Sequence, residues 1–214
     1  MRGTRPLTDT ELCHLLETLS SPGWGRERIL VLLGVRTGLR LSSMLQLRVG
    51  DVAIAGEVQD RIRVRRGTTT GKRAGFDLPL HPQAAAALQT YLDASPDRSP
   101  GDYLFPGRHP GARLSKTGGW RAIKRAFAAA GLVGAPTEIG SHTLRKTFAR
   151  LIYAALGHDL IRTSYALRHR SVATTVAYLS FRERKWIGRF WPSNLGDFSR
   201  EMSRQKRGLL PNCR

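Results

Sequence analysis

Cysteine is scarce in this 214-residue sequence, which contains only Cys13 and Cys213, at opposite ends of the chain. Two cysteines so far apart give neither a disulfide framework nor the paired spacing of a zinc site, so we expect a reducing compartment and no bound metal. Long apolar runs are also missing, because the longest, residues 29–35, is far shorter than the roughly 20 residues that cross a membrane. No apolar segment follows the first residues, as expected without a signal peptide. We therefore predict a cytoplasmic protein that does not contact a membrane.

Acidic residues are few as well. The chain has 16 Asp and Glu residues against 35 Lys and Arg residues, a formal net charge of +19 and an isoelectric point near 11.4. The resulting positive field attracts polyanions, so nucleic acid is the expected partner. A hydrophobic fraction of 41% and a charged fraction of 24% are typical of globular domains and exclude global disorder.

Helical periodicity dominates the chain. Thr8, followed by Glu11 three residues later, forms a capping box, which predicts the start of a helix. The segment over residues 26–35 is apolar almost all round, which is typical of a helix buried in a domain centre. Further helices are predicted over residues 42–47, 82–94 and 115–130, and as a series from 143 to about 190.

Between these helices the apolar residues alternate with polar ones, as they do in half-buried strands. The alternating sets are Val52 with Ile54, Ile62 with Val64, and Phe76 with Leu78 and Leu80. We expect three short strands with one buried face, joined in part by a basic hairpin tip over residues 67–75. The predicted fold class is mainly α with a small three-stranded antiparallel sheet.

Five side chains suit the chemistry of a phosphodiester. His142 and Arg145 are three residues apart and therefore share one face of a helix. Arg40, His169 and Tyr178 stand elsewhere in the chain. Arginine binds phosphate oxygens through a planar, bidentate fork, histidine moves protons near neutral pH, and tyrosine can form a covalent intermediate.

Three stretches that contain these residues resemble the catalytic domain of the tyrosine recombinase, or phage integrase, family. They are TGLRLSSMLQLRVGDV at 37–52, SHTLRKTFA at 141–149 and LRHRSVATTVAYLSF at 167–181, and YLFP at 103–106 is a less specific match. The resemblance covers about residues 7–190. It implies the fold of the DNA breaking-rejoining enzymes.

The resemblance also implies a role for each residue. Arg40 matches the first catalytic arginine, His142 and Arg145 the HxxR pair, His169 the second histidine and Tyr178 the nucleophile. A second candidate pair, His158 and Tyr165, follows His142 too closely for the family. His169, 27 residues after His142 and nine before Tyr178, has the fitting spacing. We therefore interpret His158 and Tyr165 as structural.

The mechanism implied by the resemblance uses neither a metal nor a high-energy cofactor. Tyr178 attacks a phosphodiester of double-stranded DNA, forms a 3′-phosphotyrosyl link and releases a 5′-hydroxyl, and a 5′-hydroxyl of a second duplex reverses the step. Arg40 and Arg145 clamp the phosphate, His142 accepts the tyrosine proton, and His169 donates to a phosphate oxygen. Recombination by this family implies a homotetramer assembled on DNA.

Two positions depart from the family pattern. The family places a general-acid lysine at the hairpin tip, where this chain has Thr69. Lys72 is the best substitute, because Arg66 and Arg73 hardly release a proton. The sequence favours two interpretations of Lys72 equally: a catalytic lysine and a solvated lysine at the hairpin tip. Ser43 stands where an acidic residue commonly orients the first arginine, and it supplies no charge.

The organisation expected from the sequence is one catalytic domain over residues 1–198 and a basic tail over residues 199–214. Many family members have a separate N-terminal DNA-binding domain, and because the first helix starts near Thr8 we expect none here. Two alternatives remain open: a catalytically impaired DNA-binding protein of the same fold, and a topoisomerase of type IB character that acts on one duplex.

Overall fold

The computed structural model describes residues 4–66, 75–132, 139–169 and 171–179. In that part of the chain the α-helices are α1 (Asp9–Thr18), α2 (Gly25–Thr37), α3 (Leu41–Met44), α4 (Pro82–Asp93), α5 (Lys116–Ala129), α6 (Ser141–Ala155), α7 (Leu160–Ala166) and α8 (Val172–Leu179), and η1 (Val49–Asp51) is a 3-10 turn. The strands are β1 (Ala53–Ile54), β2 (Glu57–Val58), β3 (Arg61–Val64) and β4 (Phe76–Pro79). The predicted mainly α fold is confirmed.

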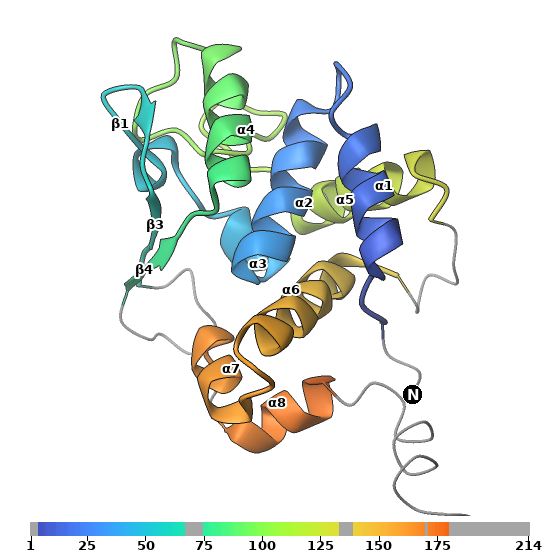
Figure 1. Cartoon of the computed structure of the whole chain (residues 1–214). Coiled ribbons are helices and arrows are strands. Elements are labelled where there is room, and N and C mark those ends of the chain that lie inside the picture. Colours follow the sequence, from blue (N-terminus) through green and yellow to red (C-terminus); the bar gives the residue numbers. More distant parts are fainter. Residues whose placement is uncertain (1–3, 67–74, 133–138, 170, 180–214) are drawn as a thin grey trace, which may run out of the picture.

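Helix α2 lies at the centre of the domain, with α4, α5 and α6 packed around it (Figure 1). Its residues from Ile29 to Val35 are all buried, which confirms the prediction of a helix buried in the centre of the domain. The predicted capping box is also present, because Thr8 and Glu11 exchange hydrogen bonds at the start of α1. Helix α3 is shorter than predicted. The amides of Gln46 and Leu47 donate to the carbonyls of Ser43 and Met44, three residues earlier, and these hydrogen bonds form turns in place of a further α-helical turn.

The strands do not form the expected three-stranded sheet. Within the described residues β1 pairs only with β2, and β3 pairs only with β4, in two antiparallel two-stranded sheets. Ala55 and Gly56 both have positive φ angles, 50° and 85°, which build a two-residue hairpin turn between β1 and β2. The hairpin turns Ile54 outward, and its side chain is 67% exposed instead of buried.

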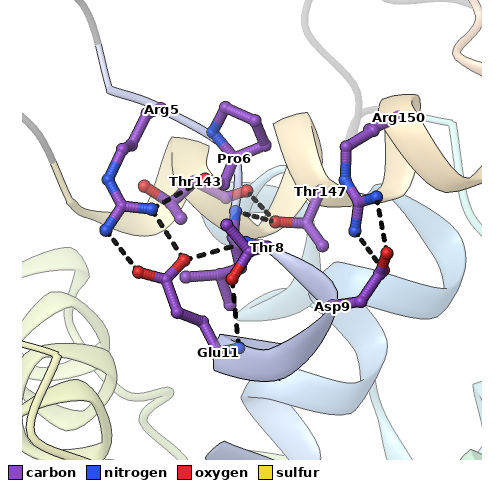
Figure 2. A network of polar contacts seen from close by, with 9 residues as sticks. Arg5, Pro6, Thr8, Asp9, Glu11, Thr143, Thr147 and Arg150 are labelled. Carbon is purple, nitrogen blue, oxygen red and sulfur yellow. Dashed lines mark hydrogen bonds and ion pairs between the residues drawn. The ribbon is translucent and has the colours of Figure 1, made fainter. Parts of the chain in front are cut away.

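Helix α6 is fixed to the first residues of the domain by polar contacts (Figure 2). The Leu7 amide donates to the Thr147 hydroxyl at 2.9 Å, and that hydroxyl donates to the Thr143 carbonyl. Arg150 forms an ion pair with Asp9 at 2.6 Å. These contacts lie along α6, so α1 and the segment before it set the position of that helix.

A second, smaller apolar cluster joins α6 to α7 and α8, which lie together beyond α6 in Figure 1. Its buried members are Ala149, Leu167 and Leu179, and Phe148 and Tyr178 pack against it among the partly buried residues. Helix α6 thus contacts the main core through one face and this cluster through another. In the described residues no helix combines the length and the apolar character needed to cross a membrane.

Candidate active site

The arginine of the HxxR pair connects three segments of the fold. Arg145 is 7% exposed, and its guanidinium donates to the carbonyls of Gly38, at the end of α2, and Leu167, at the end of α7. The bond to Leu167 measures 2.6 Å. These two carbonyls stand two residues before Arg40 and two residues before His169. Arg145 therefore aligns the segments that carry the other predicted site residues.

Arg40 projects from the turn that ends α2. Gly38 caps α2 with a φ of 65°, and a Cβ added to it would lie 2.4 Å from Cδ1 of Phe148 on α6. Only glycine combines this φ with such a close approach. Arg40 then adopts an extended conformation at the start of α3, where its side chain is exposed. The tight α2–α6 packing thus brings Arg40 beside the first turn of α6.

A cavity of about 310 Å³ opens between these elements. Arg40, His142 and Arg145 line it together, which brings the HxxR pair and the first arginine to one site. The other lining residues are Leu41, Ser42, Lys116, Trp120 and Ser141. Sequence motifs did not single out Lys116 or Trp120, although a lysine and an aromatic residue one turn apart at the start of a predicted helix were a usable signal.

The segment that carries His169 is fixed by the C-terminal cap of α7. The amides of Arg168 and His169 both bond back to this helix, to Tyr165 and Ser164, each at 3.0 Å. This pattern is a Schellman motif, and it places Arg168 in the left-handed region at a φ of 52°. The Arg168 guanidinium lies 3.4 Å from the centre of the Phe76 ring on β4. The cap orients the next residue, His169, toward α8.

Tyr178 lies among positively charged and imidazole side chains. Its ring centre is 5.3 Å from that of His169 in an edge-to-face arrangement, 6.0 Å from the Arg145 guanidinium carbon and 5.6 Å from the Lys146 nitrogen. The Tyr178 hydroxyl is buried and accepts no hydrogen bond that meets normal geometry within the described residues. Burial raises the pKa of Tyr178, while the charges of Arg145 and Arg40 act in the opposite direction.

The pKa values of both histidines are lowered, which favours the uncharged form of each ring. Burial, followed by the charges of Arg145 and Arg40, lowers the pKa of His169 to about 4. The pKa of His142 is lowered by burial first, and then by Arg40, Arg145 and Lys146. Two neutral imidazoles beside two guanidinium groups can donate to a phosphate oxygen or accept from a phenol without adding charge of their own.

The structure thus brings together the five residues singled out in the sequence, which are Arg40, His142, Arg145, His169 and Tyr178. Lys72 and Thr69 lie outside the described residues. Ser43 is buried on α3, and its amide bonds to the Arg40 carbonyl at 2.9 Å.

Neither residue of the second candidate pair from the sequence lines this cavity. His158 is exposed and packs edge-on against Tyr153, with ring centres 4.9 Å apart, and Tyr165 is 78% exposed. His158 follows Gly157 in the cap of α6, where the His158 amide bonds to the Tyr153 carbonyl. This capping geometry accounts for the Leu-Gly-His pattern at this position.

Comparison with known proteins places the chain in a family. The sequence model of the phage integrase family matches residues 5–184. The tyrosine recombinase XerC of Herpetosiphon aurantiacus is 33% identical over 171 residues, which are 78% of this chain and 52% of that protein. The chain therefore spans about half the length of that curated relative.

Solved structures agree with this match. A crystal structure of XerA recombinase superposes with a TM-score of 0.66 at 26% identity, covering 90% of this chain and 67% of that one. The XerH site-specific recombinase in a post-cleavage complex with palindromic difH superposes with a TM-score of 0.65 at 25% identity. The match covers 88% of this chain and 52% of the XerH chain. Because the family model spans most of the chain and the fold matches as well, the chain belongs to the phage integrase family.

Proposed function

We propose that this protein is a site-specific recombinase that cleaves and rejoins double-stranded DNA through a covalent bond to Tyr178. The observation that carries the proposal is the position of the Tyr178 ring, whose centre lies 6.0 Å from the Arg145 guanidinium carbon and 5.3 Å from the centre of the His169 ring. The charges of Arg145 and Arg40 act on this phenol and the His169 ring packs against it, surroundings that a tyrosine packed only as a core aromatic does not need. The post-cleavage DNA complex of the related XerH recombinase supports the same substrate class.

In the proposed step the Tyr178 oxygen attacks a backbone phosphorus, and the bond from phosphorus to the 5′-oxygen breaks. The phenolic proton passes to a base, and the leaving 5′-oxygen takes up a proton from an acid. The 3′-phosphotyrosyl bond conserves the energy of the phosphodiester, so a 5′-hydroxyl can reverse the step without a high-energy cofactor. His142 is the proposed base, because its lowered pKa favours the uncharged ring, which can accept the proton.

The two arginines stabilise the charge that develops on the phosphorane. Arg40 is exposed at the cavity, while Arg145 is held from behind by two carbonyls and keeps its other N–H groups for a ligand. A guanidinium has five N–H groups, so two bonds to carbonyls leave donors for the phosphate. Such preorganised donors stabilise a transition state by about 3–4 kcal/mol each. His169 supplies a further donor to a phosphate oxygen.

Lys72 is the proposed acid for the leaving oxygen, although it lies outside the described residues. Exchange between two duplexes needs two cleavages in each of them, which requires four nucleophilic tyrosines. We therefore extend the proposal to four protomers assembled on DNA.

The test is a trapped covalent complex. The full chain first selects a binding site from random duplexes, and a nick placed next to the cleaved bond then lets the short 5′-hydroxyl strand diffuse away. We expect a protein–DNA adduct that survives denaturing electrophoresis. Tyr178→Phe should abolish the adduct, whereas Tyr165→Phe, which alters the exposed second candidate, should keep it. Absence of an adduct on a duplex that the protein protects in a footprint would refute the proposal.

A plasmid assay separates the remaining alternatives. Supercoiled plasmids with one or two copies of the selected site are incubated with the protein. A recombinase deletes or inverts the DNA between the two sites of the two-site plasmid. An enzyme of type IB character instead relaxes both plasmids and leaves the order of their sequences unchanged. Binding without an adduct indicates a DNA-binding protein that has lost turnover.

A further inference from the structure

Thr175 is a fully buried polar residue of α8 to which the family motifs assign no role. Its side chain is 0% exposed, and its hydroxyl oxygen lies 2.8 Å from Nδ1 of His169. It stands three residues before Tyr178, so both side chains face the same side of the helix. Thr175 therefore contacts the predicted phosphate-binding histidine from its buried side.

The protons available on the Thr175 hydroxyl and the His169 ring decide which of the two groups donates the hydrogen bond. The pKa of His169 is lowered to about 4, so near pH 7 the ring is neutral and carries one N–H. The Thr175 hydroxyl also has one proton, and within the described residues it has no hydrogen-bond partner besides Nδ1. If Nδ1–H donated to the hydroxyl, the Thr175 proton would be a buried donor without an acceptor, which is unfavourable. Among the described residues, Nδ1 is the one acceptor available to this hydroxyl, so the hydroxyl donates to Nδ1.

We propose that Thr175 is a positioning residue that holds His169 in the tautomer with the proton on Nε2. In this state Nδ1 accepts from the threonine, and Nε2–H is the donor on the side of the ring that faces away from Thr175. The use of that donor on a phosphate oxygen rests on the proposed function. The placement of the proton itself does not, because it follows from the contact between Thr175 and His169.

The placement matters because the other tautomer would present a lone pair to the phosphate. A lone pair repels a phosphate oxygen, whereas an N–H stabilises it. A partner that selects the tautomer of a histidine is a known way to set the direction of its hydrogen bonds. Thr175 and Tyr178 lie on one helix, so the contact also links the orientation of His169 to the placement of α8.

The first experiment reads the proton directly in the DNA-free full chain. Histidines are labelled with ¹⁵N, and the ring signals of His169 are identified by their loss in His169→Asn. At pH 7 we expect a protonated Nε2 and an unprotonated, hydrogen-bonded Nδ1. Thr175→Ser should retain this pattern, and Thr175→Val, which keeps the shape of the side chain, should shift the Nδ1 resonance and yield mixed tautomers. A protonated Nδ1 in the unsubstituted protein overturns the proposal.

The second experiment measures the rate of covalent adduct formation on the nicked duplex. We expect Thr175→Val to slow it about 10- to 100-fold, and Thr175→Ser to restore it. Thr163→Val is the matched control, because Thr163 is equally buried but its hydroxyl donates to the backbone carbonyl of Asp159, the N-cap of α7, instead of to a histidine. Unchanged ring signals and an unchanged rate in Thr175→Val overturn the proposal. If the unsubstituted protein forms no adduct, the proposed function fails, and the ring signals still decide the role of Thr175.

Discussion

At the scale of single residues, the fold holds the two site arginines in different ways. Arg145 is buried and donates to two backbone carbonyls, whereas Arg40 is exposed at the cavity. The Arg145 guanidinium therefore belongs to the hydrogen-bonded interior of the fold, whereas the Arg40 guanidinium is a surface group. Substitution with lysine, which keeps the charge but not the planar fork, separates these two situations.

We predict that Arg145→Lys lowers the free energy of unfolding by about 1–3 kcal/mol, because one ammonium group cannot satisfy both the Gly38 and Leu167 carbonyls. Arg40→Lys should change it by less than about 0.5 kcal/mol. Both variants should slow adduct formation by about 100- to 1000-fold. Urea denaturation and the nicked-duplex assay measure these effects. Equal stability of the two variants would contradict the role of Arg145 as a link between segments.

The lowered pKa of His169 predicts a pH dependence of stability. The unfolded imidazole has its ordinary pKa of 6.5 and the folded one about 4, so between these values the unfolded chain binds the extra proton. Stability is therefore complete above pH 6.5 and falls as the pH drops toward 4. His142, whose pKa is also lowered, adds a change in the same direction.

We expect the melting temperature to fall between pH 7.5 and pH 4.5, and to fall less in His169→Asn, which cannot take up the proton. Thermal unfolding followed by circular dichroism at each pH measures both curves. The comparison uses the change with pH within each protein, so an overall loss of stability in the variant does not affect it. Parallel curves would show that His169 is not held neutral by the fold.

At the scale of elements, the junction of α2 and α6 depends on one glycine. We predict that Gly38→Ala lowers the free energy of unfolding by about 2 kcal/mol or more, because left-handed strain adds to overpacking against Phe148. Gly131→Ala is the matched control, since Gly131 has nearly the same φ, +64°, and nothing within 4 Å of an added Cβ. Its cost should be limited to the strain of about 1 kcal/mol. Urea denaturation that gives equal values for the two variants would contradict the close packing.

Elements with strong local signals were predictable from the sequence. The capping box of Thr8 and the all-apolar run of α2 define their helices through contacts within a few residues. The pairing of the strands was not predictable, because β1 and β2 have only two residues each and their turn is formed by Ala55 and Gly56, without the usual Asn-Gly or Asp-Gly signal.

In the candidate site, too, some features were predictable from the sequence and others were not. Arg40, His142, Arg145, His169 and Tyr178 were singled out by their chemistry and by the resemblance of the stretches that carry them to the tyrosine recombinase family, which are properties of the sequence. The carbonyl partners of Arg145 and the Thr175 contact were not found, since they join residues through the packing of helices. A threonine three residues before the predicted nucleophile was the available signal, but threonine is common in helices that carry no active-site residue.

At the scale of the whole molecule, the excess of positive charge has a measurable consequence. A chain with a net charge of +19 that binds DNA neutralises phosphates and releases counterions. Each neutralised phosphate adds about 0.9 to the slope of log affinity against log salt concentration, with a negative sign. Arg40, Arg145 and Lys116, which line one cavity, are three of the cations expected to contribute.

We predict a slope of about −5 or steeper for binding to the selected duplex, which corresponds to about six neutralised phosphates. Lys116→Gln should reduce the slope by about 1, because this lysine lies at the cavity beside Arg40. Arg28→Gln is the matched control with the same loss of charge, since Arg28 stands near the other end of α2, about 15 Å along the helix from Gly38. Fluorescence anisotropy between 50 and about 300 mM salt measures all three slopes in the range where counterion release dominates. Equal slopes for the two variants would mean that the DNA backbone does not follow this cavity, and a slope shallower than about −2 would mean that the net charge is not used for DNA binding.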